Sequence, residues 1–112
     1  MAAYNSVTEF LDSGKELPDA VFAANDLSAI GALEAFRDGG VNVPGQVSVM
    51  GCDDIETTRL VSPSVTTIRT FFEKQGIIAV EQLIRMINGE EGKLITLNGR
   101  IIPRDSTIAK DL

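Results

Sequence analysis

Two short, mostly apolar segments constrain the fold more than any other feature of this sequence. They are AVFAA at 20–24 and VSVMG at 47–51, and each has the length and composition of a strand that is covered on both faces. Between them, apolar residues recur at helical spacing from residue 26 to about residue 38, and two glycines then stop the helix. A strand, a helix and a second strand in this order form a βαβ unit, so the sequence predicts that the two strands are parallel.

The rest of the chain continues this alternation of helices and strands. The pattern predicts a helix over 3–11, a third strand within SVTTIRT at 64–70, and a strongly apolar helix over 72–88. The Asn98-Gly99 pair is typical of a two-residue hairpin but equally of a bend in one extended segment, and the sequence leaves both readings open. The expected fold class is α/β, with a three-layer, Rossmann-like parallel sheet.

Composition excludes several classes of function. The 112 residues, 44% of them hydrophobic, suffice for one core, and the net charge of −6 argues against direct nucleic-acid binding by this segment. With Cys52 as the single cysteine and no histidine, neither an internal disulfide nor a usual zinc ligand set is possible. The sequence shows no secretory signal and no run near the ~20 apolar residues of a membrane span. We therefore expect no metal, no cofactor, no membrane contact and a cytoplasmic location.

Polar residues follow both strands of the βαβ unit. Asn25 comes after the first strand and Asp53 after the second, and in an open parallel sheet both positions face the ligand crevice at the carboxyl edge. An amide and a carboxylate together suit a ligand rich in hydroxyl groups, such as a sugar or a ribose. The alternative is that both are ordinary turn residues. For the adjacent Asp26 and Asp54, a role as helix caps is the preferred interpretation.

Catalysis fits these residues less well than binding. No nucleophile, histidine or metal ligand set accompanies the two adjacent aspartates, and the chain has no GxxxxGK[ST] phosphate loop. We therefore assign no catalytic residue. Phe71 and Phe72 are expected by default to be core residues at a helix start, and stacking of either ring on a ligand is the alternative.

Four blocks of sequence, in order, resemble the C-terminal third of a LacI/GalR-type bacterial transcriptional regulator. They are AND with a helix of small residues after it, VPGQVSVMGCDD, the P-x-x-TTIR strand and the terminal RDST, and together they run from about residue 4 to residue 107. This resemblance implies a type I periplasmic-binding-protein-like core, in which a small effector binds between two lobes. It places Asn25 and Asp53 at positions that contact the effector, and Phe72 at an aromatic position that lines the effector pocket in some members.

The resemblance also implies partners and a division of the chain. Ile30, Leu60 and Val61 correspond to the dimer interface of the family, and operator DNA is contacted only through an N-terminal domain that this chain lacks. The chain is thus expected to be a fragment. Residues 1–68 would belong to the C-terminal subdomain of the core, 69–102 would cross to the N-terminal subdomain, and 103–112 would return.

The expected function is therefore effector binding and dimerisation within a LacI-type DNA-binding regulator, with a sugar or a sugar derivative as the effector. A rival from another class is a periplasmic or membrane-tethered sugar-binding protein for transport, which has the same fold and crevice. An enzyme is the third possibility. The double aspartate together with P-x-x-TTIR favours the regulator.

Overall fold

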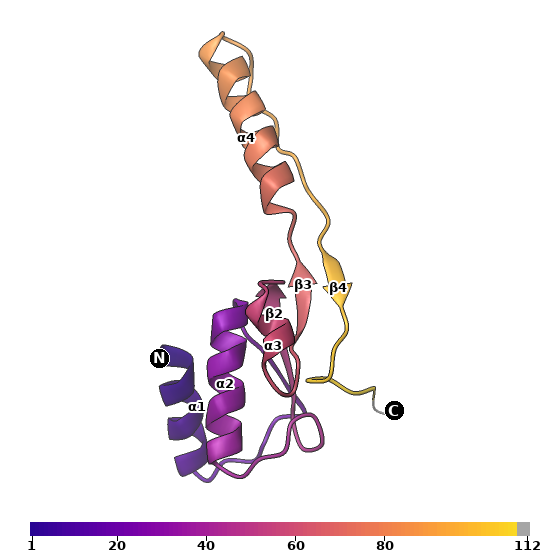
Figure 1. Cartoon of the computed structure of the whole chain (residues 1–112). Helices are drawn as coiled ribbons and strands as arrows, with labels where there is room; N and C mark the ends of the chain where they lie inside the picture. Colours follow the sequence, from indigo (N-terminus) through magenta and orange to yellow (C-terminus); the bar gives the residue numbers. More distant parts are fainter. Residues whose placement is uncertain (110–112) are drawn as a thin grey trace.

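The computed structural model describes residues 1–109 and confirms the predicted order of helices and strands (Figure 1). The last three residues of the predicted return segment, 103–112, lie outside the described residues. One short helix was missed by the sequence analysis. The elements are α1 (Ala2–Asp12), β1 (Ala20–Phe22), α2 (Asp26–Asp38), β2 (Ser48–Asp53), α3 (Thr57–Leu60), β3 (Thr66–Arg69), α4 (Phe72–Ile87) and β4 (Arg100–Ile102).

The four strands form one sheet in the order β1-β2-β3-β4. β1, β2 and β3 are parallel, with Val21 opposite Val49 and Met50 opposite Thr66, so the predicted βαβ unit is confirmed. β4 is antiparallel to β3. Because β4 begins directly after Gly99 and pairs with β3, the Asn98-Gly99 pair does not close a two-residue hairpin, and the alternative of an extended segment is confirmed.

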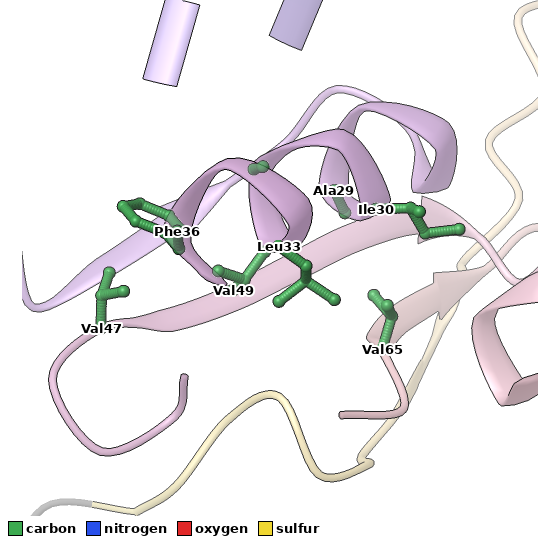
Figure 2. Packing of buried hydrophobic residues seen from close by; sticks show 8 residues of the cluster. Ala29, Ile30, Leu33, Phe36, Val47, Val49 and Val65 are labelled. Atoms are coloured by element: carbon green, nitrogen blue, oxygen red, sulfur yellow. The ribbon is translucent and has the colours of Figure 1, made fainter. Parts of the chain in front are cut away.

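The hydrophobic core lies between α2 and one face of the sheet (Figure 2). Phe36 is 1% exposed, and three valines from the strands and the segments before them are fully buried beneath α2. α1 packs against α2, and its Val7 and Leu11 touch the same cluster. The cluster consists of Ala29, Ile30, Ala32, Leu33, Phe36, Val47, Val49 and Val65.

The opposite face of the sheet carries no helix of the described residues. Phe22 and Ile101 are each 62% exposed on the sheet. Phe22, Met50 and Ile108 line an open hollow of about 480 Å³. The described chain therefore supplies the sheet and one helical side of the expected three-layer architecture.

Residues 70–99 form an arm that projects from the body, which we define as residues 1–69 and 100–109 (Figure 1). The arm consists of α4 and an extended segment that runs back beside it, and the Lys93 amide donates to Gln82 Oε1 at 3.2 Å. No residue of α4 is buried. The radius of gyration is 17.9 Å, whereas a compact chain of this length has a radius of about 13 Å. The arm accounts for the elongated shape, 57 × 29 × 27 Å.

Candidate functional site

The carboxyl edge of the parallel strands brings together Asn25, in the loop after β1, and Asp53, the last residue of β2. β1 and β2 are neighbours in the sheet, so the loops after them start side by side. The Ile55 amide donates to Asp26 Oδ2 at 2.9 Å, which joins the two loops directly. Both predicted ligand residues therefore lie beside this hydrogen bond between Ile55 and Asp26, at the same edge of the sheet.

Asn25 is the N-cap of α2, a role that the sequence analysis gave to Asp26. Its backbone is extended, and its Oδ1 accepts a hydrogen bond from the Ser28 amide at 2.8 Å. The prediction that Asp26 caps the helix is wrong, because the helix begins one residue earlier than that reading requires. The cap uses only the amide oxygen of Asn25. Its amide nitrogen has no hydrogen-bond partner within residues 1–109, so both of its N–H donors are unused in this part of the chain.

Asp26 is fully buried and joins three elements. Its Oδ1 accepts from Thr67 Oγ1 at 2.5 Å, and its Oδ2 accepts from the Ile55 amide. These bonds satisfy a carboxylate whose burial would otherwise be costly. Gly51 makes this approach possible, because a Cβ there would overlap Asp26 Oδ1 and lie 3.1 Å from Asp26 Cα. Asp26 thus fixes the start of α2 against β2 and β3.

The backbone at the end of β2 is unusual at two consecutive residues. Asp53 has a φ angle of 118° and Asp54 a φ angle of 58°. Residues other than glycine rarely adopt positive φ angles. Strain of this kind persists only where the surrounding contacts determine the conformation, and it concentrates at functional sites. Burial raises the pKa of the neighbouring Cys52 thiol, and the Asp53 carboxylate raises this pKa further. The Asp53 side chain therefore lies close to the Cys52 thiol at the carboxyl edge of the sheet.

Asp54 binds arginines from three separate segments. Its side chain is only 3% exposed. Arg69 Nε donates to its Oδ2 at 2.6 Å, Arg104 Nη2 donates to its Oδ1, and Arg59 Nη2 lies 3.6 Å from Oδ2. Burial raises the pKa of the Asp54 carboxyl, but the hydrogen bonds from Arg104 and Arg69 outweigh this effect and hold the pKa below its usual value. The prediction that Asp54 is a helix cap is wrong, since the residue before α3 is Glu56.

Two residues of the terminal RDST block, Arg104 and Ser106, had no predicted role. Arg104 Nη1 donates to Thr58 Oγ1 at 2.8 Å and to the Val65 carbonyl at 2.9 Å. Ser106 is fully buried, and its Oγ donates to the Val49 carbonyl at 2.6 Å. These bonds tie the returning segment to β2 and to the start of β3. The block was recognised as a family signature, but no local pattern indicates partners so distant in the sequence.

The other predicted site residues lie in different surroundings. Phe72 is 57% exposed at the start of α4, the element that follows β3. Leu60 is 77% exposed, whereas Ile30 is 8% exposed within the core and Val61 is partly buried against it. Ile30 and Val61 also line a shallow hollow with Glu34 of α2. Their roles in effector binding and dimerisation remain predictions.

Comparison with known sequences identifies the family. Residues 1–107 match the periplasmic binding protein-like domain family. The lactose operon repressor of Rhizobium radiobacter is 37% identical over 90 residues, which cover 80% of this chain and 80% of that protein. The chain belongs to the LacI family of transcriptional regulators. It forms part of the effector-binding core of that family.

Longer relatives show how much of a LacI-type protein this chain represents. The transcriptional regulator MalR of Clostridium butyricum is 33% identical over 105 residues, which cover 93% of this chain but 31% of that protein. The transcriptional regulator RegA of Clostridium acetobutylicum is 40% identical over 94 residues, which cover 82% of this chain and 28% of that protein. The LacI-family chain thus spans less than a third of these two relatives' length. Both of these relatives are transcriptional regulators.

Solved LacI-family structures confirm the fold class. The lac repressor dimer bound to operator and the anti-inducer ONPF superposes with a TM-score of 0.87 at 31% identity, covering 97% of this chain and 38% of that chain. A LacI family regulator from Arthrobacter sp. FB24, in complex with lactose, gives a TM-score of 0.78 at 33% identity, covering 96% and 41%. Both superpositions cover at least 96% of this chain and so include most of the arm. None of the described helices has the length and apolar character needed to cross a membrane.

Proposed function

We propose that this chain supplies one wall of the effector site and part of the dimer interface of a cytoplasmic LacI-type regulator, and that the effector is a sugar or a sugar derivative. The observation that carries the proposal is the position of Asn25 and Asp53 at the carboxyl ends of adjacent strands of one βαβ unit in a chain of this family. The lactose complex of the Arthrobacter regulator supports the choice of a sugar.

The proposed site combines three kinds of contact. The Asp53 carboxylate accepts hydrogen bonds from ligand hydroxyl groups, and the Asn25 amide nitrogen donates to a ligand oxygen. The exposed Phe72 ring at the base of the arm packs on an apolar sugar face. On this proposal, residues 1–68 and 103–112 belong to one subdomain and 69–102 to the other, so the ligand contacts both parts of the chain.

The effector site is tested by Asp53→Ala in a whole regulator that contains this chain. The effector should bind about 2 kcal/mol, or about thirtyfold, more weakly, because one of its hydroxyl groups loses a charged acceptor in a desolvated crevice. Isothermal titration calorimetry with candidate sugars measures this change. Asp105→Ala is the matched control, because Asp105 is an exposed carboxylate whose partner is Ser64, outside the strand edge. Unchanged affinity in Asp53→Ala would remove Asp53 from the site.

The isolated 112-residue chain should bind such sugars only weakly. A two-lobed site gains affinity by enclosing its ligand, and one wall leaves many polar partners to water, so we expect dissociation constants weaker than about 1 mM. A saturable titration in the micromolar range would contradict this expectation.

The proposed dimer interface comprises Ile30, Leu60 and Val61, with operator DNA bound only by the N-terminal domain of the whole regulator. Leu60 is the best probe of this interface because it is 77% exposed, whereas Ile30 and Val61 also contribute to the core. Leu60→Asp should dissociate the dimer of a whole regulator in analytical ultracentrifugation. Leu94→Asp, at a 98% exposed position of the arm, is the control and should leave the dimer intact. The opposite pattern would move the interface to the arm.

A further inference from the structure

The arm is connected to the body by two segments, and one carboxylate holds both. The outgoing connection leaves β3 after Arg69, and the returning connection passes through β4 to Arg104. Arg69 Nε donates to Asp54 Oδ2 at 2.6 Å, while Arg104 Nη2 donates to Asp54 Oδ1. Each oxygen of the same buried carboxylate therefore binds one of the two connections.

Asp54 and Arg104 are themselves anchored in the body. The Asp54 amide donates to Thr67 Oγ1 at 3.3 Å, and that hydroxyl donates to Asp26 at the start of α2. Arg104 uses its second terminal nitrogen to bind Thr58 Oγ1 and the Val65 carbonyl. The planar guanidinium suits this role because its fork of donors engages several acceptors at once. The arrangement fixes the base of the arm to a rigid part of the core.

Few other contacts determine the direction of the arm. β3 and β4 pair over only three residues, from Thr67 opposite Ile102 to Arg69 opposite Arg100. No residue of α4 is buried, so the helix does not rest on the body. β3 is also held on its other side by β2, with Asp53 opposite Arg69, whereas β4 pairs only with β3 among the described strands. The charged contacts at Asp54 are thus the main constraint beyond the strand pairing.

We propose that Asp54 is a hinge-positioning residue, which fixes the direction in which the arm leaves the body and couples the outgoing and returning connections. We call Asp54 with Arg59, Arg69 and Arg104 the Asp54 clamp. Asp54 follows Asp53 directly, so the clamp also supports the strained backbone of the candidate effector residue. The proposal does not depend on which effector binds, or on whether Asp53 binds one.

The test measures the distance between body and arm in this 112-residue chain. Spin labels are attached at Arg37→Cys in α2 and Glu81→Cys in α4, in a Cys52→Ser background, and are diluted with unlabelled protein so that only distances within one chain contribute. Pulsed dipolar spectroscopy should give one narrow distribution for the otherwise unchanged chain. Asp54→Asn should broaden this distribution by about twofold, because a hinge without its charged contacts samples more orientations. Urea unfolding of the same samples verifies that the body remains folded.

Asp105→Asn is the matched control, since Asp105 lies on the same returning segment but binds only Ser64 among the described residues. It should leave the distribution unchanged. If Asp54→Asn unfolds the body, Arg69→Gln decides instead, because it removes one connection at a side chain that is 38% exposed. Broadening in that variant supports the clamp. The proposal is overturned by an unchanged width in the deciding variant, or by a distribution that is already as broad in the unchanged chain.

Discussion

Two helices of similar length, α2 in the body and α4 in the arm, have opposite surroundings. α2 has 13 residues and buries eight of them, including Ala29, Leu33 and Phe36, against the sheet and α1. α4 has 16 residues and buries none, although its sequence is at least as apolar. Leu83 and Ile84 are more than half exposed. A stripe of apolar residues indicates that one face of a helix favours burial. Whether that face is buried depends on which other segments pack against it.

The polar contacts of the two regions differ in the same way. In the body, the buried side chains of Asp26 and Ser106 are bonded to strands and loops far away in the sequence. In the arm, the hydrogen bond between Lys93 and Gln82 spans only eleven residues. Long-range polar contacts therefore hold the body in one arrangement, whereas the arm is held at its base.

The largest expected difference between these regions is in the free energy of unfolding after truncation to alanine. Phe36→Ala should lower it by about 4 kcal/mol because the ring is 1% exposed and leaves a cavity. Leu83→Ala, at a 56% exposed position, should change it by less than about 0.5 kcal/mol. Urea titrations followed by circular dichroism measure both values. A loss in Leu83→Ala close to that in Phe36→Ala would show that α4 is covered in solution, most simply by a second copy.

The next largest effect concerns the clamp at the base of the arm. Asp54→Asn should lower the free energy of unfolding by about 3 kcal/mol at neutral pH, because the arginines then lie beside an uncharged amide instead of a carboxylate. The folded-state pKa of Asp54 is lowered, so its contribution is present above the pKa of an unfolded aspartate and is lost as pH falls through the folded value. The difference between the unchanged chain and Asp54→Asn should therefore shrink as the pH falls below the pKa of an unfolded aspartate, about 3.9.

Asp105→Asn is again the control for this pH dependence. Its carboxylate is exposed, so the substitution should change stability little at any of these pH values. A pH-independent difference between Asp54→Asn and the unchanged chain would contradict the assignment of charge to the clamp.

Local patterns predicted most of the secondary structure, because each of these elements has its own signal, and missed only the one-turn helix α3 among the described elements. The alternation of short apolar strands and helices gave the βαβ unit, and the rule for parallel sheets placed Asn25 and Asp53 at one edge. The same local reasoning misassigned Asp26 and Asp54 as caps. Their true partners include Thr67, 41 residues from Asp26, and Arg104, 50 residues from Asp54. Contacts over such distances follow from the assembled sheet, and no neighbouring residue indicates them.

Alanine substitutions of two glycines, one in the body and one in the arm, should change the stability of the chain in opposite directions. Gly51→Ala should destabilise the chain by about 2 kcal/mol, because the new methyl group overlaps the Asp26 carboxylate beneath α2. Gly76→Ala in α4 meets nothing within 4 Å. It should stabilise the helix by up to about 1 kcal/mol, since alanine favours the helix more than glycine does. Circular dichroism at increasing urea concentrations measures both changes. Destabilisation by Gly76→Ala would reveal a partner packed on that face of the arm.

The smallest expected effect separates the two roles of Asn25. As the N-cap of α2, its side-chain oxygen accepts from the Ser28 amide, so Asn25→Ala should lower the free energy of unfolding by about 1 kcal/mol. Asn25→Ser retains a capping oxygen and should be close to the unchanged chain in stability, but it loses both amide donors. In a whole regulator that contains this chain, Asn25→Ser should therefore bind effector about tenfold more weakly while unfolding normally.

The serine variant is informative because the two roles predict different combinations of results. If Asn25 only caps α2, serine preserves both stability and effector affinity, and the body needs no ligand contact at this position. If Asn25 also donates to the effector, affinity falls although the cap and the packing of α2 are intact. Calorimetry and urea unfolding on the same protein distinguish these cases. Loss of stability in Asn25→Ser, with affinity retained, would contradict both assignments, because the asparagine would then stabilise the edge of the sheet through its amide nitrogen.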